Sequence, residues 1–426
     1  MQKTKKLIEG ILNEVLGEIK PDSDYEKEIF KRINDIIKKI NQNQRHIRAI
    51  LGGSGAKGTW LKTFDADIFV LFDYKKNSSG SDKISDALEK ILKKKFSNVV
   101  RLHGSRDYFQ IKQSDFTFEI IPILKIQNSR QAKNITDVSP LHSKWVSKHK
   151  SILDEMKLAK QFCRAQNVYG AESYIRGLSG YVCEILTAHY GSFINLMKGA
   201  SKWKEKKIID VERHYRGKDV FKIINTSKLE SPLIVIDPVQ KERNAAAALS
   251  VEKFEAFRTS AGEFLNSPSK SFFENKDIEA IFLNHKSKNH KMVIVQACPQ
   301  HGKIDVVGGR LLKIYEFLKK KAENYNFKII KADWEWDRRN NSVFYFLFDA
   351  KPLERNFEVK GPPAKMIEHA EDFKKIHRSI FTRGSRIFAT VERKFLNPDD
   401  FLRHLIKDEF VKERCAGITV HSDLSG

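Results

Sequence analysis

Two carboxylates that follow a glycine-rich turn are the side chains best suited to chemistry in this sequence. Asp65 and Asp67 are separated by one residue and stand at the start of an apolar run, 68–72, that has the length of a buried strand. Because successive side chains on a strand alternate between its two faces, both carboxylates point to the same face. Carboxylate oxygens are ligands that Mg²⁺ prefers, so the pair indicates a site for a divalent metal ion.

The glycine-rich turn spans residues 52–61 and reads Gly-Gly-Ser-Gly-Ala-Lys-Gly-Thr-Trp-Leu. Glycines allow a tight turn whose backbone N–H groups face an anion. Ser54 adds a hydroxyl donor and Lys57 adds a positive charge, so the turn suits a triphosphate. It is not a Walker A loop, because no Lys-Ser or Lys-Thr pair follows the glycines. It is not a GxGxxG dinucleotide turn, because it leads into a carboxylate-bearing strand.

A third carboxylate lies on the next predicted strand, which runs through residues 116–124. Asp115, Thr117 and Glu119 share one face of this strand, and apolar side chains share the other. Glu119 is therefore the predicted third ligand. Three carboxylates can hold two metal ions about 4 Å apart, one activating an attacking hydroxyl and the other stabilising a leaving pyrophosphate. The chemistry that needs this arrangement is nucleotidyl transfer.

Each of these features has a simpler structural interpretation when it is taken alone. The glycines could form an ordinary turn, Asp65 and Asp67 a solvated strand edge, and Glu119 an exposed strand position. Their occurrence in this order, at spacings that strands allow, is more specific than any single feature and favours the catalytic interpretation.

The order of glycine turn, Asp-x-Asp and third carboxylate resembles the nucleotidyltransferase superfamily of DNA polymerase β. Longer segments narrow the resemblance to the archaeal-type, class I CCA-adding enzymes, which are tRNA nucleotidyltransferases. These segments are residues 137–145, 168–172, 175–184, 237–246 and 392–395. The resemblance covers nearly the full chain and is densest from residue 52 to residue 273.

This resemblance implies roles for individual residues. Asp65, Asp67 and Glu119 would be the metal ligands, although the family commonly has Asp at the third position and often Glu at the first. The family usually has Arg at the Lys57 position; Lys keeps the charge but loses the bidentate fork. The implied nucleotide-binding residues are Gly53, Ser54, Lys57, His142, Lys160, Tyr169 and Arg243.

Several of these nucleotide-binding residues also have structural alternatives. Arg243 is implied to read the Watson–Crick edge of the incoming base, yet it could simply pair with an acid. His142 could be a structural histidine, Lys160 could lie on a mostly solvated helix, and Tyr169 could only pack.

Composition bounds the class of protein. The chain has 426 residues, which suggests about three domains. Lys and Arg number 77 against 54 Asp and Glu, a net charge of +23 that favours a polyanionic partner, nucleic acid before membrane. A hydrophobic content of 41% excludes bulk disorder, and we expect neither a membrane helix nor a secretory signal. Four cysteines without a CxxC pair make a disulfide framework or zinc ribbon unexpected and favour the cytoplasm.

The predicted fold is α+β in three parts. Residues 1–143 form a polymerase-β-like catalytic domain with a small mixed sheet, 144–265 a helical central domain that completes the nucleotide pocket, and 266–426 an α+β C-terminal and tail region. We expect a first helix ended by Pro21 and a second capped by Ser23 or Asp24. Other predicted elements are a helix at 81–96, strands at 292–297, 327–331 and 343–348, a helix at 311–322, and a helical C-terminus after a chain break at 361–363.

Basic residues outside the catalytic segment suggest where RNA binds. The predicted phosphate contacts are Lys202, Lys204, Lys206, Lys207, Lys319 and Lys320. The resemblance implies a tRNA acceptor arm as partner, CTP and ATP as substrates, and two Mg²⁺ ions; a homodimer is compatible with the sequence. Two alternatives stay open: a poly(A) polymerase-like RNA nucleotidyltransferase, and a non-catalytic RNA-binding relative, which the departures at Lys57 and Glu119 would permit.

Overall fold

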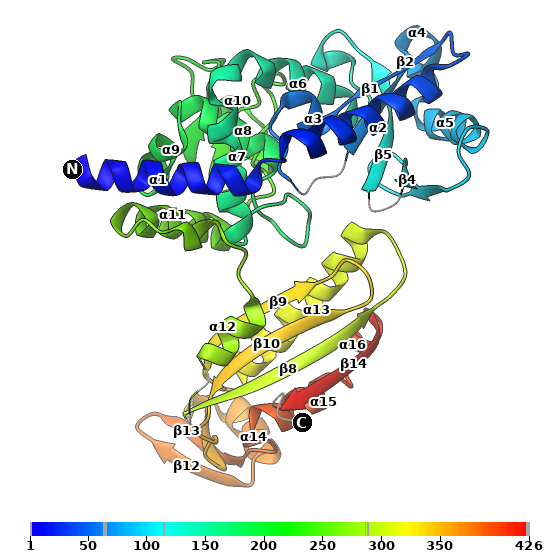
Figure 1. Ribbon diagram of the computed structural model, residues 1–426. Coiled ribbons are helices and arrows are strands. Elements are labelled where there is room, and N and C mark those ends of the chain that lie inside the picture. Colours follow the sequence, from blue (N-terminus) through cyan, green and yellow to red (C-terminus); the bar gives the residue numbers. More distant parts are fainter. Residues whose placement is uncertain (1, 63–65, 114–115, 286, 288, 423–426) are drawn as a thin grey trace. The chain divides into compact units, whose positions relative to one another are not determined.

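The computed structural model describes residues 2–62, 66–113, 116–285, 287 and 289–422, and its contacts divide the chain into two compact units (Figure 1). The N-terminal unit is Met1–Lys276 and the C-terminal unit is Asp277–Gly426. The predicted domain boundaries near residues 143 and 265 stay predictions.

The N-terminal unit combines helices with a five-stranded sheet. Its helices are α1 (Gln2–Ile19), α2 (Ser23–Asn41), α3 (Gly53–Lys57), α4 (Tyr74–Asn77), α5 (Ile84–Lys93), α6 (Ser139–Val146), α7 (Leu153–Ala165), α8 (Gly180–Tyr190), α9 (Phe193–Ala200), α10 (Val220–Ile223) and α11 (Val251–Asn266). Its strands are β1 (Ile47–Leu51), β2 (Ala66–Asp73), β3 (Val99–Leu102), β4 (Tyr108–Gln113), β5 (Phe116–Lys125), β6 (Lys207–Ile209) and β7 (Leu233–Val235).

The first two helices lie close to their predicted positions. α1 ends before Pro21, as expected from a residue that cannot continue a helix. The cap of α2 is neither Ser23 nor Asp24 but Asp22, whose side chain accepts a hydrogen bond from the backbone N–H of Tyr25. The helix predicted at 81–96 is shorter, because a 3₁₀ segment, Ser78–Lys83, precedes α5.

The five-stranded sheet has the order β1-β2-β5-β4-β3 and is mixed, since β2 pairs with β5 in parallel and the other pairs are antiparallel. One face packs on α2 and α5 through buried side chains such as Ile33, Leu88, Ile68 and Phe118. Alternation along β2 and β5 places Asp67, Thr117 and Glu119 on the other face, beside apolar side chains such as Phe69 and Ile123. The candidate site therefore lies on the face that α2 and α5 do not cover.

A second core lies among α7, α8, α9 and α11. Phe162 is fully buried at its centre, and its ring lies 5.5 Å from that of Phe193 and 5.7 Å from that of Phe273. The segment from 144 to 265 was predicted to be helical, but it also holds the short parallel pair β6 and β7. Among the described residues, no helix is both long and apolar enough to cross a membrane.

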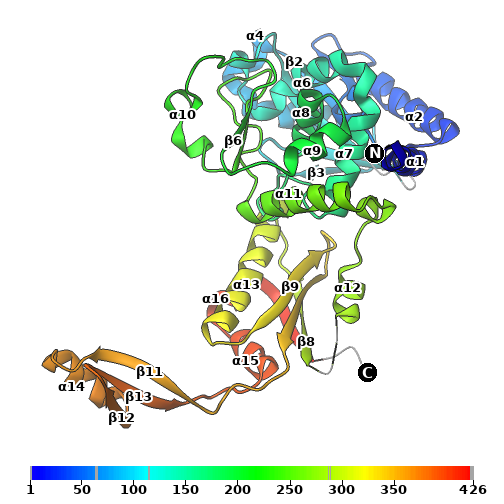
Figure 2. The same ribbon diagram turned by 90° about the vertical axis from the view of Figure 1, so that its left-hand side faces the viewer.

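The C-terminal unit contains two antiparallel sheets. Its elements are α12 (Ile278–Asn284), β8 (His290–Pro299), α13 (Ile304–Asn324), β9 (Ile329–Trp336), β10 (Ser342–Asp349), β11 (Asn356–Pro363), α14 (Ile367–Ile376), β12 (Ser379–Arg383), β13 (Arg386–Glu392), α15 (Pro398–Leu405), α16 (Glu409–Lys412) and β14 (Cys415–Ser422). The sheet β14-β8-β10-β9 lies between α12 and α13 (Figure 2), and the sheet β11-β13-β12 packs on α14.

The prediction of a helical C-terminus was wrong. Residues 361–363 do not break the chain but end β11, and three of the elements that follow are strands, β12, β13 and β14. β14 pairs with β8, more than 100 residues earlier in the chain, and such distant pairing leaves no local signal.

A buried ion pair fixes the loop that links β5 to α6. Asp137 is fully buried and accepts hydrogen bonds from the guanidinium of Arg106. It also accepts from the backbone N–H groups of Leu124 at 2.9 Å and of Lys133 and Asn134, both at 3.0 Å. The carboxylate therefore holds the loop that leads to His142.

We expect Asp137→Ala to lower the free energy of unfolding by about 3–5 kcal/mol, because it leaves the buried Arg106 without its counter-charge. Urea denaturation of the full chain measures this. The control is Asp372→Ala, which removes an exposed pair with Lys375 and should cost below about 1 kcal/mol. Equal effects of the two substitutions would contradict the role given to Asp137.

Candidate functional site

The sheet register places two of the predicted carboxylates side by side. Asp67 on β2 is the direct partner of Glu119 on β5 in the parallel pairing. Neighbouring strands lie about 4.8 Å apart and directly paired side chains point to the same face. Both residues are half-buried, on the face opposite the core. The predicted ligand Asp65 lies outside the described residues.

The glycine turn presses against the Asp67 carboxylate. The backbone N–H of Gly52 donates to the carbonyl of Asp67 at 2.7 Å. Gly53 has φ +51°, and a Cβ added to it would lie 1.6 Å from Asp67 Oδ2. Only glycine fits there, so the turn is held in contact with β2. The turn continues as α3, which carries Ser54 and Lys57.

Glu119 is oriented by a side chain that the sequence did not single out. Gln110 on β4 is the direct antiparallel partner of Glu119, and its Nε2 donates to Glu119 Oε1 at 3.0 Å. An amide donor restricts a Glu side chain, so Gln110 helps to fix the orientation of the Glu119 carboxylate.

A buried carboxylate on α8, Glu184, accepts hydrogen bonds from two lysines of the site, Lys57 and Lys160. Glu184 is 0% exposed, and its Oε1 accepts from Lys160 Nζ at 2.6 Å and from Thr59 Oγ1 at 2.5 Å. Its Oε2 accepts from Lys57 Nζ at 2.9 Å. The glycine turn, α7 and α8 therefore meet at one acid.

These charges shift the pKa values of the groups involved. Burial alone raises the pKa of Glu184, but the adjacent Lys160 and Lys57 outweigh it and lower that pKa to about 2. Burial lowers the pKa of Lys160, and Glu184 opposes this by favouring the ammonium form. Glu184 is therefore a carboxylate at neutral pH.

A second buried acid organises the next part of the site. Asp237 Oδ2 accepts from Arg243 Nη1 at 2.7 Å and lies 3.3 Å from His142 Nε2. The Tyr181 hydroxyl lies 3.3 Å from Asp237 Oδ1, and its ring stacks on that of His142 at 4.0 Å between centroids. Lys57 Nζ lies 4.9 Å from the Tyr181 ring centroid, so this group adjoins the Glu184 group. Arg243 does pair with an acid, and the pair lies within the site.

The protonation of His142 follows from this setting. Burial lowers its pKa, Asp237 acts in the opposite direction, and Lys57 and Arg243 lower it further. The net lowering favours a neutral imidazole at neutral pH.

Tyr169 and Lys160 both lie beside Gly180, the first residue of α8. A Cβ added to Gly180 would meet the Tyr169 hydroxyl at 2.7 Å and Lys160 Cε at 3.3 Å. The guanidinium of Arg164 lies 5.0 Å from the centroid of the Tyr169 ring. The structure thus gathers Lys57, His142, Lys160, Tyr169 and Arg243 in one region of the N-terminal unit.

The predicted RNA-binding lysines differ in their surroundings. Lys202, Lys204 and Lys207 are exposed, Lys320 on α13 is exposed, and Lys319 is half-buried. Lys206 is also exposed, but its Nζ donates to the backbone carbonyls of Leu229, Glu230 and Ser231 at 2.5, 2.9 and 3.3 Å. An ammonium has three donors, so the geometry favours a structural role for Lys206.

Two of the three predicted metal ligands, Asp67 and Glu119, lie side by side on the sheet and suit a divalent ion. Asp67 and Glu119 offer the hard oxygen atoms that Mg²⁺ prefers. Within the residues that the structure describes, no three His, Cys, Asp or Glu side chains gather as ligands of one ion, and the predicted third ligand is outside that part.

Three sequence-family models match consecutive parts of the chain and together cover most of it. Residues 31–139 match the nucleotidyltransferase domain, 154–274 the second domain of tRNA nucleotidyltransferase, and 302–424 the C-terminal domain of CCA-adding enzyme. The CCA-adding enzyme of Nanoarchaeum equitans is 34% identical over 87% of this chain and 90% of its own length. That of Methanocaldococcus jannaschii is 33% identical over 94% and 91%.

Solved structures support the fold. A crystal structure of the Cid1 poly(U) polymerase matches with a TM-score of 0.51 at 16% identity, covering 65% of this chain and 99% of that one. The fold and the paired carboxylates define a polymerase-β-like nucleotidyltransferase, which confirms the predicted fold class. Within that class, the chain belongs to the CCA-adding enzymes, the family that its motifs resemble.

Sequence reasoning gave no role to Glu184, Gln110 or Asp237. A signal existed for Glu184, since a lone carboxylate within the apolar stretch 180–187 is costly to bury without a partner. Gln110 stands on a strand whose register no local pattern reveals. Asp237 was visible only as a turn residue before Pro238.

We expect Gly53→Ala to reduce nucleotide addition at least roughly a hundredfold, because the new Cβ would displace the Asp67 carboxylate from its place. The matched control is Gly217→Ala, at φ +73° with open space around its Cβ, which carries the same backbone strain without a clash. Steady-state addition rates compare the two. Equal losses would mean that strain, rather than contact with Asp67, explains the requirement for glycine.

Proposed function

We propose that this chain adds C, C and A to the 3′ end of tRNA from CTP and ATP without a nucleic-acid template. Membership of the CCA-adding enzymes supports the reaction, and the pairing of Asp67 with Glu119 beside the glycine turn is the observation that supports catalysis. A chain that only held RNA would not need two carboxylates aligned next to a turn that suits phosphate.

Different residues would bind different parts of the nucleotide. Ser54 and Lys57 on α3 would bind the triphosphate, and Arg243, held by Asp237, would face the base. Asp67 and Glu119, together with Asp65, would hold two Mg²⁺ ions, which when bound make the RNA 3′-hydroxyl a better nucleophile and stabilise the leaving pyrophosphate. Gln110 would keep the Glu119 carboxylate directed at that position.

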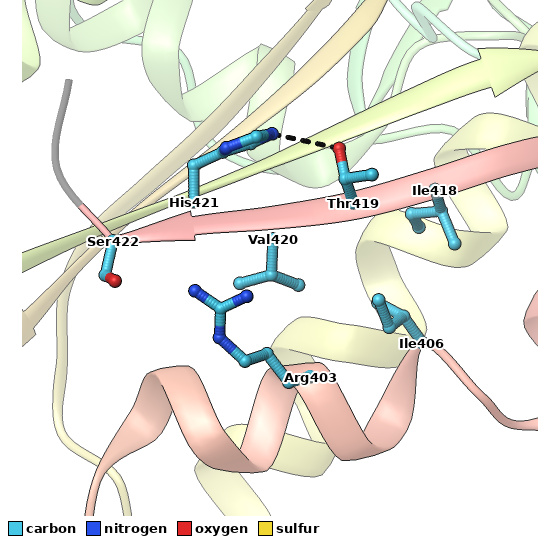
Figure 3. A pocket seen from close by; sticks show the side chains of 7 residues that line it. All are labelled: Arg403, Ile406, Ile418, Thr419, Val420, His421 and Ser422. Atoms are coloured by element: carbon cyan, nitrogen blue, oxygen red, sulfur yellow. Dashed lines mark hydrogen bonds between the residues drawn. The ribbon is translucent and has the colours of Figure 1, made fainter. Parts of the chain in front are cut away.

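The C-terminal unit offers basic surface for the tRNA partner. Two hollows of about 500 and 540 Å³ flank α15 and share Arg403. Figure 3 shows Arg403 extending from α15 toward Val420 on β14, while His421 and Thr419 point to the other side of that strand. The second hollow adds Lys394 and Lys407, with Asp400 as its one acidic lining residue. Such cations suit backbone phosphates, which position an RNA without reading its sequence.

We also propose the cytoplasm as the compartment. The Sγ atoms of Cys163 and Cys183 lie 3.7 Å apart without a bond, and all four cysteines are free thiols, which suits a reducing environment. A homodimer stays a prediction.

Product analysis with tRNA that lacks its last three nucleotides tests the proposed reaction. We expect C, C and A to be added in that order, followed by arrest, and pyrophosphate to be released. A poly(A) polymerase-like activity would instead give an extended A tail. Asp67→Asn should reduce the rate at least roughly a hundredfold, because it removes a ligand charge without changing size. No turnover by the wild-type protein would favour the non-catalytic alternative.

The salt dependence of tRNA binding tests the RNA contacts. The logarithm of the binding constant falls with the logarithm of the salt concentration. Replacing both Lys319 and Lys320 with Ala should make this slope shallower by roughly one to two, because binding then neutralises fewer phosphates and releases fewer counterions. Lys27→Ala is the control, since Lys27 is 75% exposed and pairs with Asp24. An unchanged slope in the double variant would remove these lysines from the RNA surface.

A further inference from the structure

The turn at residues 237–243, which carries Arg243, is held by side chains of a separate segment, residues 210–228. Three backbone carbonyls of the turn accept hydrogen bonds from three side chains of that segment. Each bond is 3.0 Å long, and they join His214 to Pro238, Tyr215 to Lys241 and Lys228 to Glu242. A carbonyl can only accept, so Nε2 of His214 carries its proton. The segment therefore grips the turn at three points along its backbone.

The 210–228 segment is itself firmly anchored. The Asp210 carboxylate accepts from the backbone N–H groups of His214 at 3.0 Å and Tyr215 at 2.8 Å. Glu212 Oε1 accepts from Trp145 Nε1 on α6 at 2.6 Å. The Tyr215 ring is 8% exposed and belongs to a small core whose other members are Val220, Ile224, Leu229, Ile234 and Ile236. The segment can thus act as a fixed support for the turn.

The direction of the Arg243 side chain depends on the backbone of the turn. Asp237 Oδ1 accepts from the backbone N–H groups of Val239 at 2.9 Å and Gln240 at 3.3 Å. Its other oxygen, Oδ2, accepts from Arg243 Nη1 at 2.7 Å. A shift of the turn would therefore move the carboxylate and, with it, the guanidinium.

The direction of a guanidinium matters for telling bases apart. Cytosine N3 and adenine N1 are hydrogen-bond acceptors, whereas uracil carries a proton on N3. A guanidinium offers only donors, so it can bond to the edge of C or A but meets another donor on U. This mismatch rejects U only while the guanidinium cannot turn toward the carbonyl oxygens of uracil, which accept. A fixed turn therefore makes the contact selective.

We propose that His214, Tyr215 and Lys228 are positioning residues that hold the turn at 237–243 and thereby make the Arg243 contact selective for C and A over U. This inference rests on the proposed function, since it concerns the choice of nucleotide in that reaction. The three side chains act through the backbone of the turn and do not touch the nucleotide.

The test uses Tyr215→Phe, which removes the hydroxyl that donates to Lys241 and keeps the ring in its core. The measurement is kcat/KM for CTP and for UTP in the first addition to tRNA that lacks its last three nucleotides. Tyr345→Phe is the matched control, because it also removes a buried hydroxyl, which donates to Glu335 at 2.7 Å in the C-terminal unit.

We expect Tyr215→Phe to lower the ratio of kcat/KM for CTP over UTP roughly tenfold, because a loosened turn lets Arg243 reach the carbonyl oxygens of uracil. The kcat with CTP should stay within roughly threefold of wild type, because the productive arrangement remains accessible. Tyr345→Phe should leave the ratio unchanged. A merely structural role for Tyr215 would lower the rates with both nucleotides alike and would not move the ratio.

A second anchor gives an independent variant. His214→Leu removes the donor to the Pro238 carbonyl and should lower the same ratio. His214→Gln retains an N–H donor of similar reach and should restore most of the selectivity.

An unchanged ratio in Tyr215→Phe would overturn the proposal while leaving the proposed function in place. If that variant does not fold, the ratio in His214→Leu decides in the same way. A wild-type chain that adds no nucleotide would refute the proposed function. The dissociation constants of CTP and UTP from isothermal titration would then replace kcat/KM, and an equal ratio in wild type and variant would overturn the proposal too. A wild-type chain that adds U as readily as C would refute both.

Discussion

The register between β2 and β5 is the constraint on which the rest of the site depends. A shift of one residue would place Glu119 beside Ala66 or Ile68 and turn one of the two carboxylates toward the core. The shift is prevented because alternate residues of both strands are buried under α2 and α5. The packing of one face of the sheet against α2 and α5 thus fixes the positions of Asp67 and Glu119 on the other face.

Two buried acids then organise the cations around that face. Glu184 holds Lys57 and Lys160, and Asp237 holds Arg243 beside His142. Isolated buried charges are costly, so each acid must keep its partners in place, and each cation is held before a nucleotide arrives. The ring of Tyr181 adjoins both groups, since Lys57 Nζ lies 4.9 Å from its centroid and the ring of His142 stacks on it. A nucleotide would therefore meet a site whose charges are already oriented.

The sequence was sufficient for the features that local patterns encode. The glycine turn, the strand after it and the face of Glu119 follow from residue type and strand alternation alone. It was insufficient wherever a contact spans the chain. Lys57 and Glu184 are separated by 127 positions, and no periodicity links them. The same limit explains why the strand character of β14 was missed, since its partner β8 lies far away in the sequence. The N-cap of α2 at Asp22 was missed for a local reason, because the adjacent polar residues Asp22, Ser23 and Asp24 could each cap the helix.

Anomalous diffraction from crystals grown with Mn²⁺ and a non-hydrolysable CTP analogue would locate the metal ions individually, because Mn²⁺ takes the same oxygen ligands as Mg²⁺. We expect a peak within about 2.0–2.3 Å of a carboxylate oxygen of Asp67, with Glu119 among the ligands of the same metal ions and the triphosphate against α3. A metal ion bound elsewhere, or a Glu119 carboxylate turned away from the metal ion that Asp67 binds, would contradict the proposed metal site.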